Sequence, residues 1–326
     1  MKGERGKRPS KRSGTIHKRG RAGKSRTQGA KSAARNSAAE AIVRLAIEED
    51  LGRGDATVAA LGLGSRMATG AIVAKQEGVL SGTRAARAVF ARVDPTLRWE
   101  PLLEDGAKLT PGAVIARVHG RWGSIVSGER TALNFLQRLS GIATKTARFV
   151  ELVSDTGVAI LDTRKTTPGL RVFEKEAVRH GGGRNHRFAL DDAILVKDNH
   201  LLAAGGVDRA LDRVLAAKEA QKLPVIVEIA SLRDLSRALR PGVTRILLDN
   251  MRPAQARSAA RRIHAYNEAH GASIEIEASG GITLANAAAY ALTGVDFLSI
   301  GGLTHSAPAL DLSLDLLPDD GASARR

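Results

Sequence analysis

The segment Val158-Ala-Ile-Leu-Asp-Thr-Arg-Lys165 is the first of six units in which a short apolar run ends directly in polar or small residues. The apolar runs lie at residues 158–161, 193–196, 225–227, 246–248, 274–276 and 297–300. Helical segments separate most of them, at residues 206–220, 231–239, 253–270 and 284–292. Strands that alternate with helices in this way form parallel sheets. Six such units with buried strands favour an α/β barrel, complete or incomplete, over an open sheet, and we place it at residues 141–315.

The residues before this barrel are expected to form a separate α+β domain at residues 37–140. The pattern predicts helices at 38–50 and 83–93, with short strands at 70–74, 78–80 and 113–119. A helical stretch at 129–153 leads into the barrel, and Ser140-Gly141 is a candidate break in it. Residues 316–326 are expected to form a C-terminal tail.

Residues 1–36 form a distinct basic segment. They hold 13 Lys or Arg and one acid, Glu4, and so carry +12 of the formal net charge of +16. Up to residue 29, Ile16 is the only large apolar residue besides Met1, so this segment is expected to be a disordered tail. A solvated extension is favoured over a nucleic-acid-binding arm, because aromatic residues that stack on bases are absent. We therefore expect a chain without residues 1–36 to keep its turnover.

The composition excludes several classes of protein and site. The chain has no cysteine, which rules out disulfides, thiolate metal sites and cysteine nucleophiles. No run of about 18 apolar residues occurs, so no transmembrane helix is expected. The basic start is not followed by the apolar core of a secretory signal. We expect a cytoplasmic protein with no membrane partner.

Polar or small residues follow every apolar run of the predicted barrel. Because the carboxyl ends of barrel strands form one face, Arg164, Lys197, Glu228, Asp249 and Ser279 should meet at one mouth. For a single acid, such as Glu228 or Asp249, capping of the next helix is an equally good explanation. The repetition at all six strand ends favours a catalytic face.

Two glycine-rich turns follow the last two strands, at Ser279-Gly280-Gly281 and Gly301-Gly302. Backbone N–H groups in such turns, near a helix N-terminus, bind phosphate in barrel enzymes. The alternative is that both are simply tight turns.

Within 40 residues the chain also gathers five basic side chains that can hold a small molecule with several negative charges: Arg164, Lys165, His186, Arg187 and Lys197. Arg favours planar anions geometrically, so two carboxylates on a flat ring would suit the site. The acids Glu228 and Asp249 then have two candidate tasks: binding Mg²⁺ on a pyrophosphate, or stabilising a developing cation. For His186 a structural role is the alternative.

These motifs together resemble the quinolinate phosphoribosyltransferase family over residues 38–314. The segments that carry the resemblance are Asp50-Leu-Gly-Arg-Gly-Asp-Ala-Thr57, Ser127-Gly-Glu-Arg-Thr-Ala-Leu-Asn134, Leu139-Ser-Gly-Ile-Ala-Thr144, Asp162-Thr-Arg-Lys-Thr-Thr-Pro-Gly169, Gly182-Gly-Arg-Asn-His-Arg187, Val196-Lys-Asp-Asn-His200, Glu277-Ala-Ser-Gly-Gly281 and Thr304-His-Ser306. The basic tail departs from the family pattern.

The resemblance implies a glycosyltransferase (a pentosyltransferase) that converts quinolinate and 5-phosphoribosyl 1-pyrophosphate, with Mg²⁺, to nicotinate mononucleotide, pyrophosphate and CO₂ in NAD biosynthesis. It also implies an N-terminal α/β sandwich domain, an open α/β barrel and a homodimer. Family roles then fall on particular residues of this chain. Quinolinate would be held by Arg130 from the neighbouring subunit and by Thr163, Arg164, His186, Arg187 and Lys197. Lys165, Glu228 and Asp249 would be catalytic, with the two acids also at the metal, and the phosphates would bind at Lys165, Ser279, Gly280, Gly281, Gly301 and Gly302.

Three other functions remain as alternatives. A related phosphoribosyltransferase acting on another base or a monocarboxylate would need fewer cations. A different barrel enzyme that binds a sugar phosphate would not explain the segment 180–187. A nucleic-acid-binding protein would act through residues 1–36.

Overall fold

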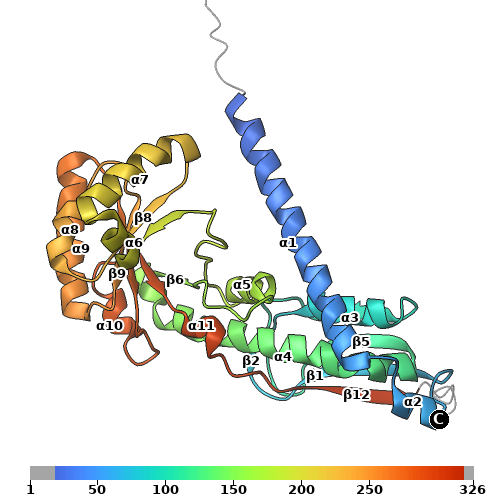
Figure 1. Cartoon of the computed structure of the whole chain (residues 1–326). Helices are drawn as coiled ribbons and strands as arrows, with labels where there is room; N and C mark the ends of the chain where they lie inside the picture. Colours follow the sequence, from blue (N-terminus) through green and yellow to red (C-terminus); the bar gives the residue numbers. More distant parts are fainter. Residues whose placement is uncertain (1–18, 319–326) are drawn as a thin grey trace, which may run out of the picture.

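The computed structural model describes residues 19–318 and divides them into two parts joined by one long helix (Figure 1). The N-terminal part contains an antiparallel sheet with the strand order β12-β1-β5-β3. These strands are β1 (Met67–Ala74), β3 (Arg98–Pro101), β5 (Val114–Arg121) and β12 (Leu312–Pro318). A small pair, β2 (Gly78–Val79) and β4 (Lys108–Leu109), lies beside them. The helices of this part are α1 (Arg19–Leu51), α2 (Ala56–Leu61) and α3 (Thr83–Val93).

The C-terminal part is built on a parallel sheet with the order β6-β11-β10-β9-β8-β7. Its strands are β6 (Ala159–Leu161), β7 (Ile194–Val196), β8 (Val225–Ile229), β9 (Arg245–Asp249), β10 (Glu275–Ser279) and β11 (Phe297–Ser299). Each overlaps one of the six predicted apolar runs. Among the described residues β6 does not pair with β7, so the barrel is open, as the resemblance implied.

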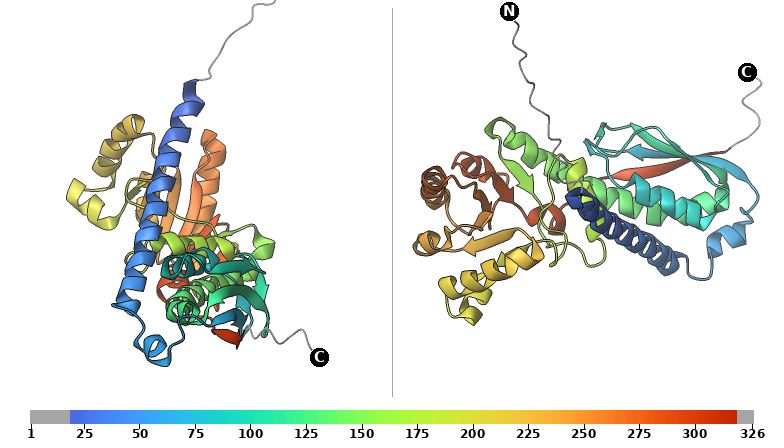
Figure 2. Two further views of the ribbon diagram at one scale, coloured as in Figure 1. Left: turned by 90° about the vertical axis from the view of Figure 1, so that its right-hand side faces the viewer. Right: turned by 90° about the horizontal axis from the view of Figure 1, so that it is seen from above.

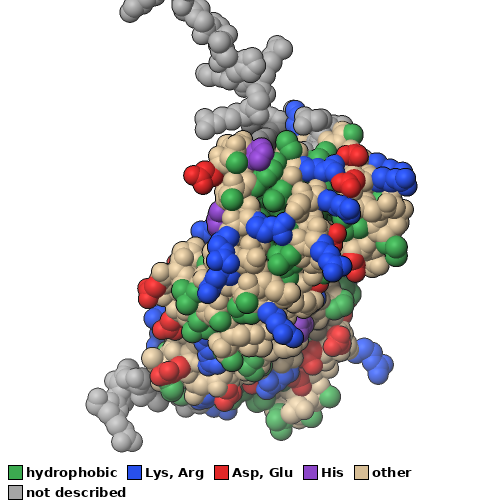
Figure 3. Space-filling view, turned by 90° about the vertical axis from the view of Figure 1, so that its left-hand side faces the viewer, with side chains coloured by type: hydrophobic (Ala, Val, Ile, Leu, Met, Phe, Trp, Pro, Cys, Tyr) green, Lys and Arg blue, Asp and Glu red, His purple; other side chains and the backbone are tan. Residues whose placement is uncertain are grey.

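Helices cover this curved sheet on its outer side (Figure 2). They are α6 (Asp198–Ala204), α7 (Val207–Gln221), α8 (Leu232–Ala238), α9 (Pro253–His270) and α10 (Ala287–Ala291). Two other helices, α5 (Arg171–His180) and α11 (Gly302–His305), pack against the long connecting helix instead, and a 3-10 turn lies at Ser154–Thr156. On the outer face shown in Figure 3, Lys and Arg side chains lie among acidic and hydrophobic ones. Within residues 19–318, no helix is both long and apolar enough to cross a bilayer.

Helix α4 (Trp122–Leu152) connects the two parts and is continuous, so the predicted break at Ser140-Gly141 is wrong. A Cβ at position 141 would lie 1.9 Å from the carbonyl oxygen of Pro308. The glycine therefore lets the returning chain approach the helix closely, and it does not interrupt the helix. Nearby, the Ser140 hydroxyl donates to the Ser81 carbonyl oxygen at 3.1 Å and accepts from the Ser81 amide at 3.0 Å.

Two predicted boundaries also differ from the structure. The sequence placed the boundary between the barrel and a C-terminal tail after residue 315. In the structure, residues 312–318 form one strand, β12, which pairs antiparallel with β1. The expected tail at 316–326 is thus a strand up to residue 318, and the rest lies outside the described residues. The predicted disorder up to residue 36 is likewise wrong from Arg19 onward, where α1 begins, while residues 1–18 lie outside the described residues.

Candidate active site

The carboxyl ends of the barrel strands surround a cavity of about 910 Å³. Every residue that the sequence predicted for the site lines it, with one exception, Arg130. The loops after the six parallel strands bring these residues together from a span of 140 positions, as the common direction of the strands requires. The convergence of the set is confirmed; the individual roles stay predictions.

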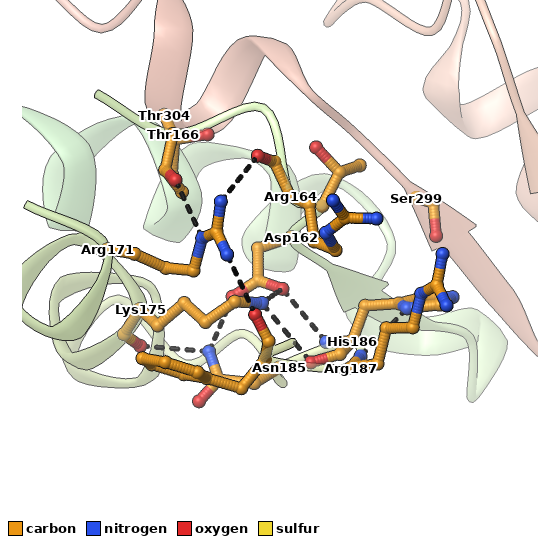
Figure 4. Close-up of polar contacts among 12 residues, drawn as sticks. Asp162, Arg164, Thr166, Arg171, Lys175, Asn185, His186, Arg187, Ser299 and Thr304 are labelled. Atoms are coloured by element: carbon orange, nitrogen blue, oxygen red, sulfur yellow. Dashed lines mark hydrogen bonds and ion pairs between the residues drawn. The ribbon is translucent and has the colours of Figure 1, made fainter. Parts of the chain in front are cut away.

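A buried carboxylate, Asp162, fixes the loops that carry the basic residues. Its oxygens accept from Asn185 Nδ2 at 2.6 Å and from the His186 amide at 2.8 Å, and it forms an ion pair with Lys175 (Figure 4). Burial raises the pKa of Asp162, and the ammonium of Lys175 opposes that shift. Because Asp162 directly follows β6, this network holds the loop with His186 against the loop with Arg164.

Arg164 and Arg187 form the most cationic part of the cavity wall. Arg164 Nε is buried and has no hydrogen-bond partner among the described residues. Burial and then the positive charge of Arg164 lower the pKa of Arg187. A buried donor without a partner is costly, and two neighbouring guanidinium groups repel one another. Both observations indicate that this region receives an anionic acceptor.

His186 is bonded through both ring nitrogens to other parts of the chain. Its Nδ1 accepts from the Arg187 amide at 2.8 Å, which leaves Nε2 to carry the proton that faces Glu277 Oε2 at 3.3 Å. The structural role that the sequence left open for His186 is therefore present in the structure. The ring also lines the cavity.

Glu277 is a residue whose importance the sequence did not reveal. It is fully buried in β10, pairs with Arg245 Nη1 at 3.0 Å and accepts from the Ser299 hydroxyl. Burial raises its pKa, but His186, Ser299 and Arg245 together lower it below the ordinary glutamate value. Glu277 is thus a carboxylate that holds His186. The available signal was an acid between two apolar residues, Ile276 and Ala278, in the middle of a short strand.

Glu228 and Asp249 end neighbouring strands on the other wall. Glu228 Oε2 lies 3.4 Å from Lys197 Nζ. Burial raises the pKa of Glu228, the Lys197 charge lowers it, and the Asp249 charge raises it again. Asp249 accepts from Asn250 Nδ2 at 2.9 Å. Two carboxylates in mutual repulsion mark a place for positive charge.

The glycine turns allow close packing around the opposite end of the cavity. A Cβ on Gly301 would lie 2.8 Å from Lys165 Cδ, so the lysine stem crosses this glycine. A Cβ on Gly280 would lie 2.1 Å from Asn250 Oδ1, and Gly280 has a φ of 92°. The Thr304 hydroxyl donates to the Lys165 carbonyl oxygen at 2.7 Å and so ties the two loops together.

Two further basic residues line this end, and neither was among the predicted site residues. Lys145 reaches the cavity from α4 and donates to the Ser306 carbonyl oxygen at 2.9 Å; burial lowers its pKa. His305 lies beside Gly301. The only signal for Lys145 was its place directly after the motif 139–144.

Arg130 lies outside this cavity. It is exposed on α4, in the half of the helix that belongs to the N-terminal part. Within a single chain, Arg130 therefore remains apart from the other predicted site residues.

Comparison with known proteins identifies the family to which this chain belongs. Family models described as quinolinate phosphoribosyl transferase, N-terminal domain and C-terminal domain, match residues 55–140 and 142–315. A probable nicotinate-nucleotide pyrophosphorylase [carboxylating] of Synechocystis is 42% identical over 271 residues, which cover 83% of this chain and 90% of the relative. The Mycobacterium leprae nicotinate-nucleotide pyrophosphorylase [carboxylating] is 42% identical over 282 residues, covering 86% and 97%.

Solved structures agree with this assignment. NadC from Streptococcus pyogenes has a TM-score of 0.79 and 39% sequence identity, covering 86% of this chain and 96% of that one. The nicotinate-nucleotide pyrophosphorylase from Francisella tularensis has a TM-score of 0.80 and 35% identity, covering 86% and 97%. The resemblance drawn from the motifs is confirmed: this chain belongs to the quinolinate phosphoribosyltransferase family.

Proposed function

We propose that this protein transfers the phosphoribosyl group of 5-phosphoribosyl 1-pyrophosphate to quinolinate, with decarboxylation, to give nicotinate mononucleotide, pyrophosphate and CO₂. The observation that carries this proposal is that Arg164, which has a buried unpartnered donor, lies beside Arg187 in a cavity whose opposite wall carries the carboxylates of Glu228 and Asp249. A dicarboxylate on a flat ring satisfies the arginines. The carboxylates Glu228 and Asp249 suit the other substrate.

The ribose carbon becomes positively charged as pyrophosphate leaves. Glu228 and Asp249 stabilise that charge electrostatically, since both are fixed at strand ends before the reaction begins. The arginines hold the pyridine ring so that its nitrogen attacks the same carbon, and positioning replaces a covalent nucleophile. The positive pyridinium nitrogen stabilises the electron pair that stays at C2 when CO₂ departs, and C2 then takes up a proton from water to give the product.

Mg²⁺ is the metal that this site fits. Among the described residues no three His, Cys, Asp or Glu side chains gather around one point, which speaks against a site made of protein ligands alone. Mg²⁺ commonly binds through one or two carboxylates together with substrate phosphates and waters, and Glu228 and Asp249 offer such a pair. When bound there, Mg²⁺ would neutralise part of the pyrophosphate charge.

A homodimer in which Arg130 enters the partner's cavity would account for an exposed arginine that its own cavity does not use. Mixing experiments test this arrangement. Arg130→Ala and Lys197→Ala should each be nearly inactive, and the mixed dimer should recover activity, because one of its two sites carries neither substitution. Lack of recovery in a verified mixed dimer would contradict it.

A direct assay tests the reaction. The purified protein with Mg²⁺ and 5-phosphoribosyl 1-pyrophosphate should release CO₂ and pyrophosphate in equal amounts from quinolinate, and it should be far slower with nicotinate. A mononucleotide formed efficiently from nicotinate, without CO₂, would instead identify a phosphoribosyltransferase for a monocarboxylate.

A further inference from the structure

Helix α1 contacts the loop that carries Arg187, although α1 lies before the region that the family models match. Lys31 Nζ lies 2.8 Å from Asp192 Oδ1 and 3.1 Å from Asp191 Oδ2. Arg35 Nη2 lies 3.6 Å from Asp192 Oδ2. Thus one turn of α1 places two cations on the acids at the end of this loop.

Asp192 passes these contacts on to the loop backbone. Its Oδ2 accepts from the amides of Phe188 at 2.8 Å and Ala189 at 3.1 Å. Burial raises the pKa of Asp192, but the bond from Lys31 and the two amides lower it below the ordinary aspartate value. The charged carboxylate of Asp192 therefore links α1, through Lys31, to the backbone of the loop.

Phe188 is held through its ring and its backbone. The Arg35 guanidinium carbon lies 4.0 Å from the ring centroid, within the range of a cation–π contact. The Phe188 carbonyl oxygen accepts from Arg171 Nη1 at 3.1 Å. Phe188 directly follows Arg187, so whatever fixes Phe188 limits the directions open to the Arg187 side chain.

The guanidinium of Arg187 is attached to the far end of the same loop. Its Nη1 donates to the Ala193 carbonyl oxygen at 3.1 Å, one residue after Asp192. Between these points the loop has no regular helix or strand in the described structure, and Leu190 at its tip is 68% exposed. A loop of this kind depends on its few side-chain contacts for a fixed geometry.

We propose that Lys31 and Arg35 are positioning residues for quinolinate binding: through Asp192 and Phe188 they hold the loop 187–193 in the conformation that directs Arg187 into the cavity. The inference rests on the proposed function for its substrate. It also refines the expectation for a chain without residues 1–36: turnover at saturating quinolinate should be kept, but the affinity for quinolinate should fall. Because the ion pairs are partly exposed, each contributes modestly, and the expected loss is about three- to tenfold in quinolinate affinity.

The test compares single substitutions in the full-length protein. Lys31→Glu and Arg35→Ala should each raise the quinolinate Kd and KM about three- to tenfold, with kcat and the KM for 5-phosphoribosyl 1-pyrophosphate changed less than twofold. Lys31→Arg should restore the wild-type values. Arg44→Ala is the matched control, since Arg44 pairs with Glu48 on α1 itself at 2.9 Å. At about 1 M salt, where screening reduces the reach of exposed charges to ~3 Å, the ratio of the Lys31→Glu Kd to the wild-type Kd should approach one.

Hydrogen exchange separates this inference from the reaction itself. The amides of Phe188 and Ala189 should exchange faster in Lys31→Glu and at the wild-type rate in Arg44→Ala, whatever substrate the enzyme uses. Unchanged exchange would overturn the inference. Faster exchange with an unchanged quinolinate Kd, or equal losses of affinity for both substrates, would overturn it too.

A wild-type protein inactive on quinolinate would refute the proposed function, and the exchange rates would still decide whether α1 holds the loop. If Lys31→Glu does not fold, Lys31→Gln serves in its place.

Discussion

The carboxylate end of the cavity (Arg164, His186 and Arg187) and its glycine end (Ser279-Gly280-Gly281 and Gly301-Gly302) are fixed in different ways. At the carboxylate end, side chains are held by two buried acids, Asp162 and Glu277. At the glycine end, backbone turns leave room for the stem of Lys165 and for Asn250. The first end therefore depends on charges that must be balanced, and the second on space that must stay empty.

The largest effect is expected for the free energy of unfolding when one of the two buried acids is removed. Asp162→Ala leaves Lys175 buried without its partner, which should lower the free energy of unfolding by about 3–5 kcal/mol. Denaturant titration followed by circular dichroism measures it. Asp191→Ala, which removes an exposed acid, is the control. A loss below about 1 kcal/mol would mean that the buried pair does not organise the carboxylate end.

Substitution of Arg187 should weaken the binding of quinolinate and leave the binding of 5-phosphoribosyl 1-pyrophosphate nearly unchanged. Arg187→Ala leaves a desolvated carboxylate of quinolinate without its partner, so binding should weaken by roughly 2–5 kcal/mol. Calorimetry should show no comparable change for 5-phosphoribosyl 1-pyrophosphate. The neighbouring exposed Arg184 provides the control, Arg184→Ala. Saturation by quinolinate at the wild-type concentration would refute this role.

The glycine end should respond to added volume instead of lost charge. Gly301→Ala places a Cβ against the stem of Lys165, and a displaced Lys165 should raise the KM for 5-phosphoribosyl 1-pyrophosphate about tenfold, which corresponds to ~1.4 kcal/mol. Gly302→Ala is the matched control, because its Cβ would meet Lys145 Nζ only at 3.6 Å. If both variants have the same KM, close packing does not position Lys165.

The smallest expected effect concerns Lys145. Lys145→Met should raise the KM for 5-phosphoribosyl 1-pyrophosphate about threefold, since one cation among several at this end is lost. Burial lowers the pKa of Lys145, so the wild-type ammonium loses its proton at a lower pH than an exposed lysine. In the wild type, loss of this proton should raise the KM for 5-phosphoribosyl 1-pyrophosphate at alkaline pH. This part of the rise in KM should be absent from Lys145→Met. Superimposable pH profiles would exclude Lys145 from this site.

The sequence predicted the strands and most of the site because both follow local rules. All six barrel strands overlap a short apolar run, and the residues at their ends face one mouth by the geometry of parallel strands. Local rules do not predict that residues 312–318 pair with β1, since a local pattern does not say which sheet a strand joins. Residues 19–36 lack apolar periodicity, so nothing indicated the start of α1. Asp162 and Glu277 act through tertiary contacts with other side chains, and a local sequence pattern does not specify such contacts.

The pairing of β12 with β1 has a consequence for biosynthesis. About 240 residues separate the two strands, so during translation the first sheet remains unfinished until nearly the whole polypeptide has left the ribosome. Until then β1 presents an unsatisfied edge, a surface on which nascent chains associate wrongly. The domain that is synthesised first is therefore completed last.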